Sequence, residues 1–105
     1  NGNADGPFIN CGFRPKYVLV KASSTTGNWE LDDGARSPYN AAQAALYPNL
    51  NIAEDTGNGI FDLVSNGFKI RSAAANANTS GATFIYMAFA EFPFGGSNVA
   101  PIPAR

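Results

Sequence analysis

Three carboxylates stand close together in the first third of the chain, at Glu30, Asp32 and Asp33. A pair of carboxylates can hydrolyse a glycosidic bond, one of them acting as the acid that protonates the leaving oxygen. Asp32-Asp33-Gly34 is also typical of a strand end and turn, because an aspartate side chain bonds to nearby backbone there. Residue types alone do not define a catalytic site. We therefore interpret the cluster as a turn and predict no catalytic residue and no enzyme activity.

Oxygen ligands recur in the middle of the chain, where Asn51, Glu54, Asp55 and Asn58 could be offered to Ca²⁺. Their spacing matches no EF-hand loop, and we interpret them as solvated loop residues. The chain has no histidine and one cysteine, Cys11, so the usual nitrogen and sulfur ligands of zinc are missing. Without a basic partner, Cys11 is expected to be a small apolar side chain rather than a nucleophile. We predict no metal site and no cofactor.

Aromatic side chains are the best candidates for binding a ligand. Trp29, Tyr39 and Tyr47 could stack on a sugar ring, since each offers a flat apolar face with a polar edge. Arg36 and Asn40 are their nearest polar companions. Trp29 beside Leu31 would fit the core equally well, and Tyr39 and Tyr47 could either pack the loop down or bind. We expect any binding surface in residues 39–58, together with the tip of the loop at residues 23–28.

Composition limits the possible partners. Of the 105 residues, 45% are hydrophobic and 14% are charged, which is typical of one globular domain with an ordinary core. The net charge of −1 leaves no basic surplus for nucleic acid. No apolar run is long enough for a membrane span, so no membrane insertion is expected. The chain begins at Asn1 rather than at methionine, which favours a fragment of a longer protein.

The elements that would position these side chains are short strands. Gly, Pro, Asn and Ser punctuate runs rich in Val, Ile, Phe, Tyr and Thr, a pattern typical of antiparallel sheets. We expect strands at 8–11 and 83–91, hairpins from 16–21 with 29–31, and a second hairpin within 60–71. The fold class is therefore all-β, a single antiparallel β-sandwich, jelly-roll-like, over residues 1–94. Residues 95–105 are expected to form an extended Gly/Pro-rich tail.

The second hairpin carries the clearest turn signal, at Asn66-Gly67, because both residues readily adopt the positive φ of a type I′ turn. A two-residue loop there would place Leu63 opposite Ile70 and Asp62 opposite Arg71. Burial of the apolar face then fixes the register. That face would consist of Phe61, Leu63, Phe68 and Ile70.

The chain between the hairpins is the least regular part. Residues 39–46 contain four alanines and could form a turn or two of helix, which Pro48 would end. Residues 49–59 are rich in Asn and Gly and predict a long surface excursion.

The last strand is apolar on both faces, with Ile85, Met87 and Phe89 on one and Phe84, Tyr86, Ala88 and Ala90 on the other. An antiparallel sheet normally exposes one face to solvent, so this strand is either covered on its back or lines a subunit contact. We therefore expect a homo-oligomer.

Several blocks carry a resemblance to a known family. They are Gly6-Pro7-Phe8, Gly12-Phe13-Arg14-Pro15 with Val18-Leu19-Val20-Lys21, Gly27-Asn28-Trp29, Ser65-Asn66-Gly67-Phe68-Lys69-Ile70-Arg71, and Phe84-Ile85-Tyr86-Met87-Ala88-Phe89-Ala90-Glu91 closed by Pro93-Phe94. From about Asn1 to Phe94, their order resembles a small all-β domain family of tail fibre, tailspike and other virion proteins of bacteriophages and prophages.

The resemblance implies a virion component located in the tail, the distal part of a trimeric fibre or spike that contacts other virion subunits. It implies a non-catalytic tail fibre or tail tip module that recognises a host cell-surface glycan or protein. The alternative is a structural component, such as a capping, attachment or capsid decoration domain, with no receptor contact.

Overall fold

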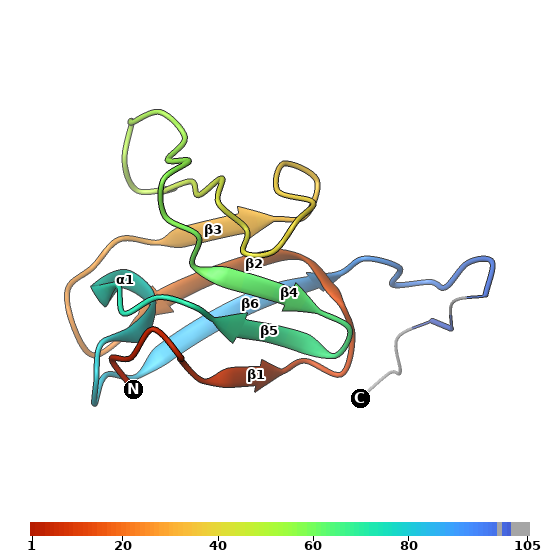
Figure 1. Ribbon diagram of the computed structural model, residues 1–105, viewed down its shortest axis with the longest axis horizontal. Helices are drawn as coiled ribbons and strands as arrows, with labels where there is room; N and C mark the ends of the chain where they lie inside the picture. The colour runs from red at the N-terminus through yellow and green to blue at the C-terminus, as the bar shows by residue number, and fades with distance from the viewer. Residues whose placement is uncertain (99, 102–105) are drawn as a thin grey trace.

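The computed structural model describes residues 1–98, 100 and 101, which form two three-stranded antiparallel sheets (Figure 1). One sheet has the order β1-β5-β4, made of β1 (Phe8–Asn10), β5 (Gly67–Ile70) and β4 (Phe61–Val64). The other has the order β3-β2-β6, made of β3 (Glu30–Asp33), β2 (Pro15–Ala22) and β6 (Phe84–Ala90). A helix of four residues, α1 (Ala75–Asn78), follows β5. Across the described chain, no helix has the length and apolar character needed to cross a membrane.

The two sheets pack face to face around one core. Side chains alternate across each strand, so Val18 and Val20 of β2 are buried, while Tyr17 and Leu19, which alternate with them, are only half-buried. The opposite sheet supplies Phe61, Leu63, Phe68 and Ile70, and the rings of Phe61 and Phe68 meet edge to face at 5.5 Å. The predicted all-β sandwich is confirmed. The chain crosses between the sheets from β1 to β2, from β3 to β4 and from β5 to β6.

The hairpin of β4 and β5 forms with the predicted core face but with a different register. Leu63 pairs with Phe68 and Val64 with Gly67, so the turn residues are Ser65 and Asn66, and neither has a positive φ. The shift by two residues leaves each side chain on its expected face. The predicted turn at Asn66-Gly67 is therefore wrong.

The cause is the neighbouring strand β1. An added Cβ on the buried Gly67 would lie 2.0 Å from the carbonyl oxygen of Ile9. The carbonyl of Asn66 accepts hydrogen bonds from the backbone N–H groups of Cys11 and Gly12, at 2.9 and 3.1 Å. Gly67 is thus needed inside the sheet for close approach of β1, and not in the turn.

The predicted helix at residues 39–46 is absent. Ala42 instead pairs with Phe61 and Ala45 with Asp55 through isolated antiparallel bridges, and both alanines are fully buried. The hydroxyl of Ser37 accepts the backbone N–H groups of Gln43 and Ala44, which a helix would have used itself. Tertiary pairing therefore overrides the helix propensity of alanine. The helix that does form, α1, lies outside the segment in which one was expected.

β6 occupies an edge of its sheet, paired with β2 from Phe84 to Ala90. Its side chains Ile85, Met87 and Phe89 are about half exposed, at 52%, 53% and 57%. The chain then continues away from the sandwich (Figure 1). Of the tail predicted at residues 95–105, positions 99 and 102–105 lie outside the described residues.

Candidate binding site

The segment that joins β3 to β4 rises above the sandwich as two successive loops (Figure 1). Its first turn is built on Asp33, at the end of β3. The Asp33 carboxylate accepts the backbone N–H groups of Ala35 and Arg36, at 3.0 and 2.8 Å. The predicted turn at Asp32-Asp33-Gly34 is thus present, and it brings the Arg36 side chain back to Asp33.

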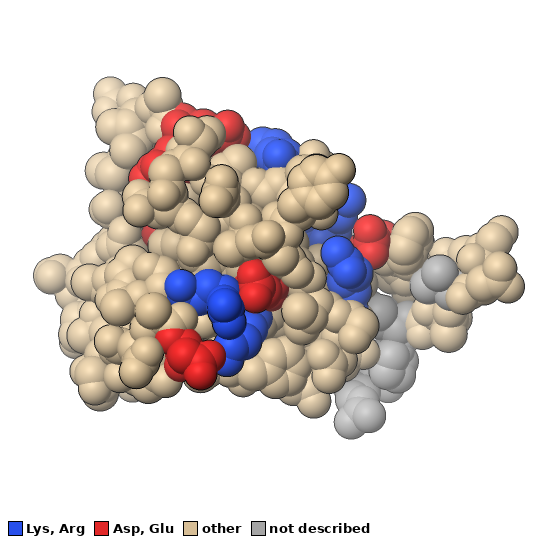
Figure 2. All heavy atoms as spheres, in the orientation of Figure 1, with Lys and Arg blue, Asp and Glu red and all other residues tan. Residues whose placement is uncertain are grey.

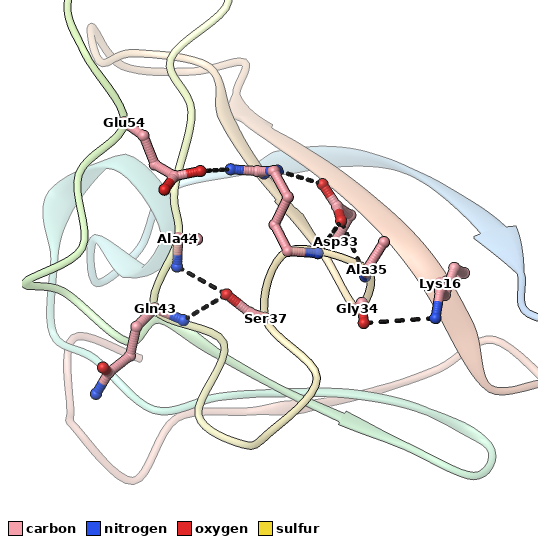
Figure 3. A network of polar contacts seen from close by, with 9 residues as sticks. Lys16, Asp33, Gly34, Ala35, Ser37, Gln43, Ala44 and Glu54 are labelled. Carbon is pink, nitrogen blue, oxygen red and sulfur yellow. Dashed lines mark hydrogen bonds and ion pairs between the residues drawn. The ribbon is translucent and has the colours of Figure 1, made fainter.

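Arg36 connects the two loops. Its Nε donates to Asp33 Oδ2 at 2.6 Å, and its Nη1 donates to Glu54 Oε2, which lies on the second loop (Figure 3). Partial burial of Asp33 opposes its ionisation. Hydrogen bonds from the backbone and side chain of Arg36 outweigh this effect, so the pKa of this carboxyl is lowered. The pKa of Arg36 is raised by the same two carboxylates, against the effect of its own burial. Both loops are therefore held together by a charged link.

Asn40 fixes the base of the segment to β4. Its side-chain Nδ2 donates to the carbonyl of Leu63 at 3.1 Å, and its Oδ1 accepts the N–H of Leu63 at 2.9 Å. Ser37 ties the same turn to Gln43 and Ala44, as Figure 3 shows. Asn40 is thus a positioning residue whose amide is already satisfied by the backbone.

Between these anchors lies an open hollow of about 500 Å³, which we call the loop hollow. Its size is typical of sites for small ligands. It is lined by Arg36, Ser37, Pro38, Tyr39, Asn40, Ala41, Gln43, Ala44, Glu54 and Thr56. Tyr39 is part of this lining and is 83% exposed. Three of the five predicted ligand-binding residues, Arg36, Tyr39 and Asn40, therefore meet at one place.

Trp29 and Tyr47 lie elsewhere. Trp29 is half-buried directly before β3, and its backbone N–H donates to Asn49 Oδ1 at 3.0 Å. Tyr47 is half-buried, and its hydroxyl donates to Asp55 Oδ2 at 3.4 Å. Burial, followed by the nearby carboxylates Glu30 and Asp55, raises the pKa of Tyr47 to about 12. Neither residue lines the loop hollow.

Two carboxylates lie beneath this segment with no exposed surface at all. Glu30 and Asp32 project from the inner face of β3, opposite Val20 and Val18 of β2. Asn76 donates to Glu30 Oε2 at 3.4 Å, whereas Glu30 Oε1 and both oxygens of Asp32 find no partner among the described residues. Burial raises the pKa of Glu30 to about 7, and burial with repulsion from Glu30 raises that of Asp32 to about 7.

Three of the four oxygen ligands considered for Ca²⁺, Glu54, Asp55 and Asn58, serve the loop itself. Asp55 accepts the N–H of Gly57 at 2.9 Å and the amide of Asn58 at 2.8 Å, while Glu54 binds Arg36. Within residues 1–98, 100 and 101, no three Asp, Glu or Cys side chains gather closely enough to hold a metal ion. Cys11 is half-buried against the core, and that burial raises the pKa of its thiol.

Sequence reasoning missed part of the lining of the loop hollow. Ser37, Gln43, Glu54 and Thr56 carry polar groups there, and none was named as a contact for a sugar. The predicted binding segment, residues 39–58, does contain the last three, and Glu54 was considered only as a ligand of Ca²⁺. Ser37 and Gln43 could have been found by their closeness to Tyr39 in the chain. Glu54 and Thr56 arrive only because the bridge between Ala45 and Asp55 folds the second loop back.

The charged side chains on the face seen in Figure 2 are dispersed. Acidic and basic groups lie beside one another, with uncharged surface between the groups, and no large area has one sign. The arrangement defines a small all-β domain whose longest loop carries a hollow. Polar side chains line this hollow, together with one pair of opposite charges, Arg36 and Glu54.

The chain belongs to a family described as a domain of unknown function, DUF7483, which matches residues 1–93. No curated protein and no solved structure matches the chain.

Proposed function

We propose that this chain is a non-catalytic recognition module of a bacteriophage tail fibre or tail tip, and that it binds a host cell-surface glycan in the loop hollow. The assignment to the virion tail is supported by the resemblance of its sequence blocks to tail fibre and tailspike domains. The assignment of the ligand is supported by the chemistry of the hollow.

The observation that carries the ligand is Tyr39. The residue is 83% exposed beside a hollow with amide, hydroxyl and carboxylate groups from Gln43, Thr56 and Glu54. Burying so large an apolar ring stabilises a complex, whereas leaving it in water does not stabilise the free chain. A sugar ring matches this pattern, because it has an apolar face for stacking and hydroxyl groups for the polar side chains.

The state of the carboxylates supports binding without bond cleavage. A glycosidase needs two carboxylates that reach the substrate from either side of the scissile bond. Glu30 and Asp32 have no exposed surface, and Asp33 and Glu54 are both held by Arg36. None of the four is therefore free at the surface to transfer a proton.

The test compares two exposed aromatic residues. Tyr39→Ala should weaken binding of the purified chain to immobilised host glycans by about 1 to 3 kcal/mol, as in other stacking sites, with an unchanged unfolding midpoint. Phe94→Ala is the matched control, since Phe94 is 93% exposed and does not line the hollow. Equal binding by both variants would exclude the hollow as the site. Attachment to protease-treated cells decides between a glycan and a protein receptor.

A structural role in the virion is the second candidate. It is favoured by the half-exposed apolar side chains of β6, which suit contact with another subunit more than contact with a polar receptor. Antibody labelling of the chain on intact particles distinguishes the two functions. A distal tail position agrees with recognition, and a position on the capsid or the fibre shaft agrees with assembly.

A further inference from the structure

The open edge of β6 is an apolar feature that the loop hollow does not explain. β6 pairs with β2 along one side only, and no described strand lies along the other. Its seven residues include no charge and no proline. Natural edge strands usually carry such residues, because an unprotected edge pairs readily with another strand. This edge therefore has the properties of an interface.

The direction of the free backbone groups follows from the two ends of β6. Ser23 N–H donates to the carbonyl of Thr83 at 2.8 Å, and Glu91 N–H donates to the carbonyl of Arg14 at 2.9 Å. Thr83 and Glu91 thus turn their backbone groups toward β2. Because this direction alternates along a strand, the residues that turn theirs toward the open edge are Phe84, Tyr86, Ala88 and Ala90.

We propose that this edge pairs with β6 of a second copy of the chain, antiparallel, about a two-fold axis at Met87. In this register Phe84 of one copy lies opposite Ala90 of the other, and Tyr86 lies opposite Ala88. These are the four residues with free backbone groups, so each pair can exchange two hydrogen bonds. The outer face then brings Ile85 opposite Phe89 and Met87 opposite Met87.

The sizes of the side chains select this register. On the inner face, each bulky residue meets an alanine of the other copy. A shift by two residues in one direction places Tyr86 against Tyr86, and a shift in the other direction places Ala88 against Ala88. The first crowds two large rings and the second leaves a gap, and both cost packing energy. The pairing is also isologous, so it closes at two copies and leaves no new edge on β6.

The inner face of β6 has surface to cover in the single chain. Tyr86 is 49% exposed, although its ring packs edge to face on Phe68 at 5.4 Å. Phe84 and Tyr86 also line an apolar cavity of about 200 Å³ between the two sheets. A second β6 would cover these rings from the open side. This inference does not depend on what the loop hollow binds.

The test uses the 105-residue chain in sedimentation equilibrium. We expect the mass of two chains, in place of the three that the tail fibre resemblance implies. Met87→Lys places two ammonium groups against each other at the axis, and it should raise the dimer dissociation constant by about tenfold or more. Ile52→Lys is the control, because Ile52 is an equally exposed apolar residue on the second loop, at 56%. It should leave the dissociation constant unchanged.

A double variant tests the register itself. Ile85→Lys combined with Phe89→Glu gives two ion pairs across the interface only if residue 85 faces residue 89. We therefore expect Ile85→Lys alone to weaken the dimer and the double variant to dimerise more tightly than Ile85→Lys. Because all three substituted positions are about half exposed, circular dichroism should show an unchanged fold. A monomer at every concentration, a mass of three chains, a dimer indifferent to Met87→Lys, or a double variant no better than Ile85→Lys would each overturn the proposal.

Discussion

β3 and β6 flank the same strand, β2, yet they depart from the usual distribution of side chains in opposite directions. β3 buries two carboxylates completely, and β6 leaves three large apolar side chains about half exposed. Charged residues are rarely buried without a partner, and contiguous exposed apolar residues usually mark contacts. Both strands pair antiparallel with β2, and the two edges differ in what covers them.

The cover of β3 is visible in the structure. Leu31 of β3 exchanges two backbone hydrogen bonds with Leu46, each of 2.9 Å, so the long loop continues the sheet beyond β3. Tyr47 follows directly, and the nearby charges of Glu30 and Asp32 contribute to its raised pKa. Nothing comparable crosses β6 among the described residues. Burial in this sheet is therefore decided by the segments added at its edges.

The largest expected effect concerns the pH dependence of β3. Glu30 and Asp32 have pKa values of about 7, above their ordinary values of 4.5 and 3.8. Folded carboxyls that bind protons more tightly than unfolded ones stabilise the fold at low pH, and this stabilisation is lost as the pH rises through about 7. We expect the free energy of unfolding in urea to fall between pH 5 and pH 8 by on the order of 3 kcal/mol or more.

The control for this prediction is Asp32→Asn, which removes one titrating group and should reduce the fall markedly. The window from pH 5 to pH 8 avoids Asp33 and Asp55, whose lowered pKa values act at lower pH and with the opposite sign. A stability that is constant or increases across this window would show that β3 does not bury these carboxylates.

A slightly smaller effect is expected in the other sheet, whose core face follows the ordinary apolar pattern. Gly67→Ala places a Cβ 2.0 Å from the carbonyl oxygen of Ile9, a backbone atom that can move only with β1. We expect a loss of about 3 kcal/mol, at the upper end of overpacking effects, measured by urea unfolding. Gly96→Ala, which meets nothing within 4 Å, should leave the stability nearly unchanged. Similar midpoints for both variants would refute the close approach of β1.

The smallest effect concerns the attachment of the loop that covers β3. Asn40→Ala removes two hydrogen bonds to the backbone of Leu63 and should cost about 1 to 2 kcal/mol. It should also reduce glycan binding, because Asn40 positions the turn beside Tyr39. Asn51→Ala, in the exposed part of the same loop, provides the reference for an asparagine that only faces solvent. If both variants have the unfolding midpoint of the wild-type chain, the loop is held by its backbone bridges alone.

The sequence was sufficient for the class of fold and for the core face of the second hairpin. Alternation within residues 60–71 identifies which side chains face the core, since a period of two leaves only two choices. It was not sufficient for the hairpin register, because the constraint on Gly67 comes from Ile9, far away in the chain. The helix predicted at residues 39–46 failed for a similar reason, since Ser37, Phe61 and Asp55 compete for its backbone groups.

The candidate site divides in the same way. Arg36, Tyr39 and Asn40 gather because they are neighbours in one turn, which the sequence displays directly. Glu54 joins them only through the folding of the second loop. The burial of Glu30 and Asp32 could not be predicted, because acidic residues in an alternating strand ordinarily indicate its solvent face.

The bridge between Ala45 and Asp55 closes the second loop at its base, with hydrogen bonds of 2.9 and 3.0 Å. The residues beyond it, from 48 to 54, are all exposed. Lengthening a loop whose ends are already joined costs little entropy, and exposed loop tips accept insertions. The junction of Asn51 and Ile52 is thus a suitable place to insert an epitope tag without rebuilding the sandwich.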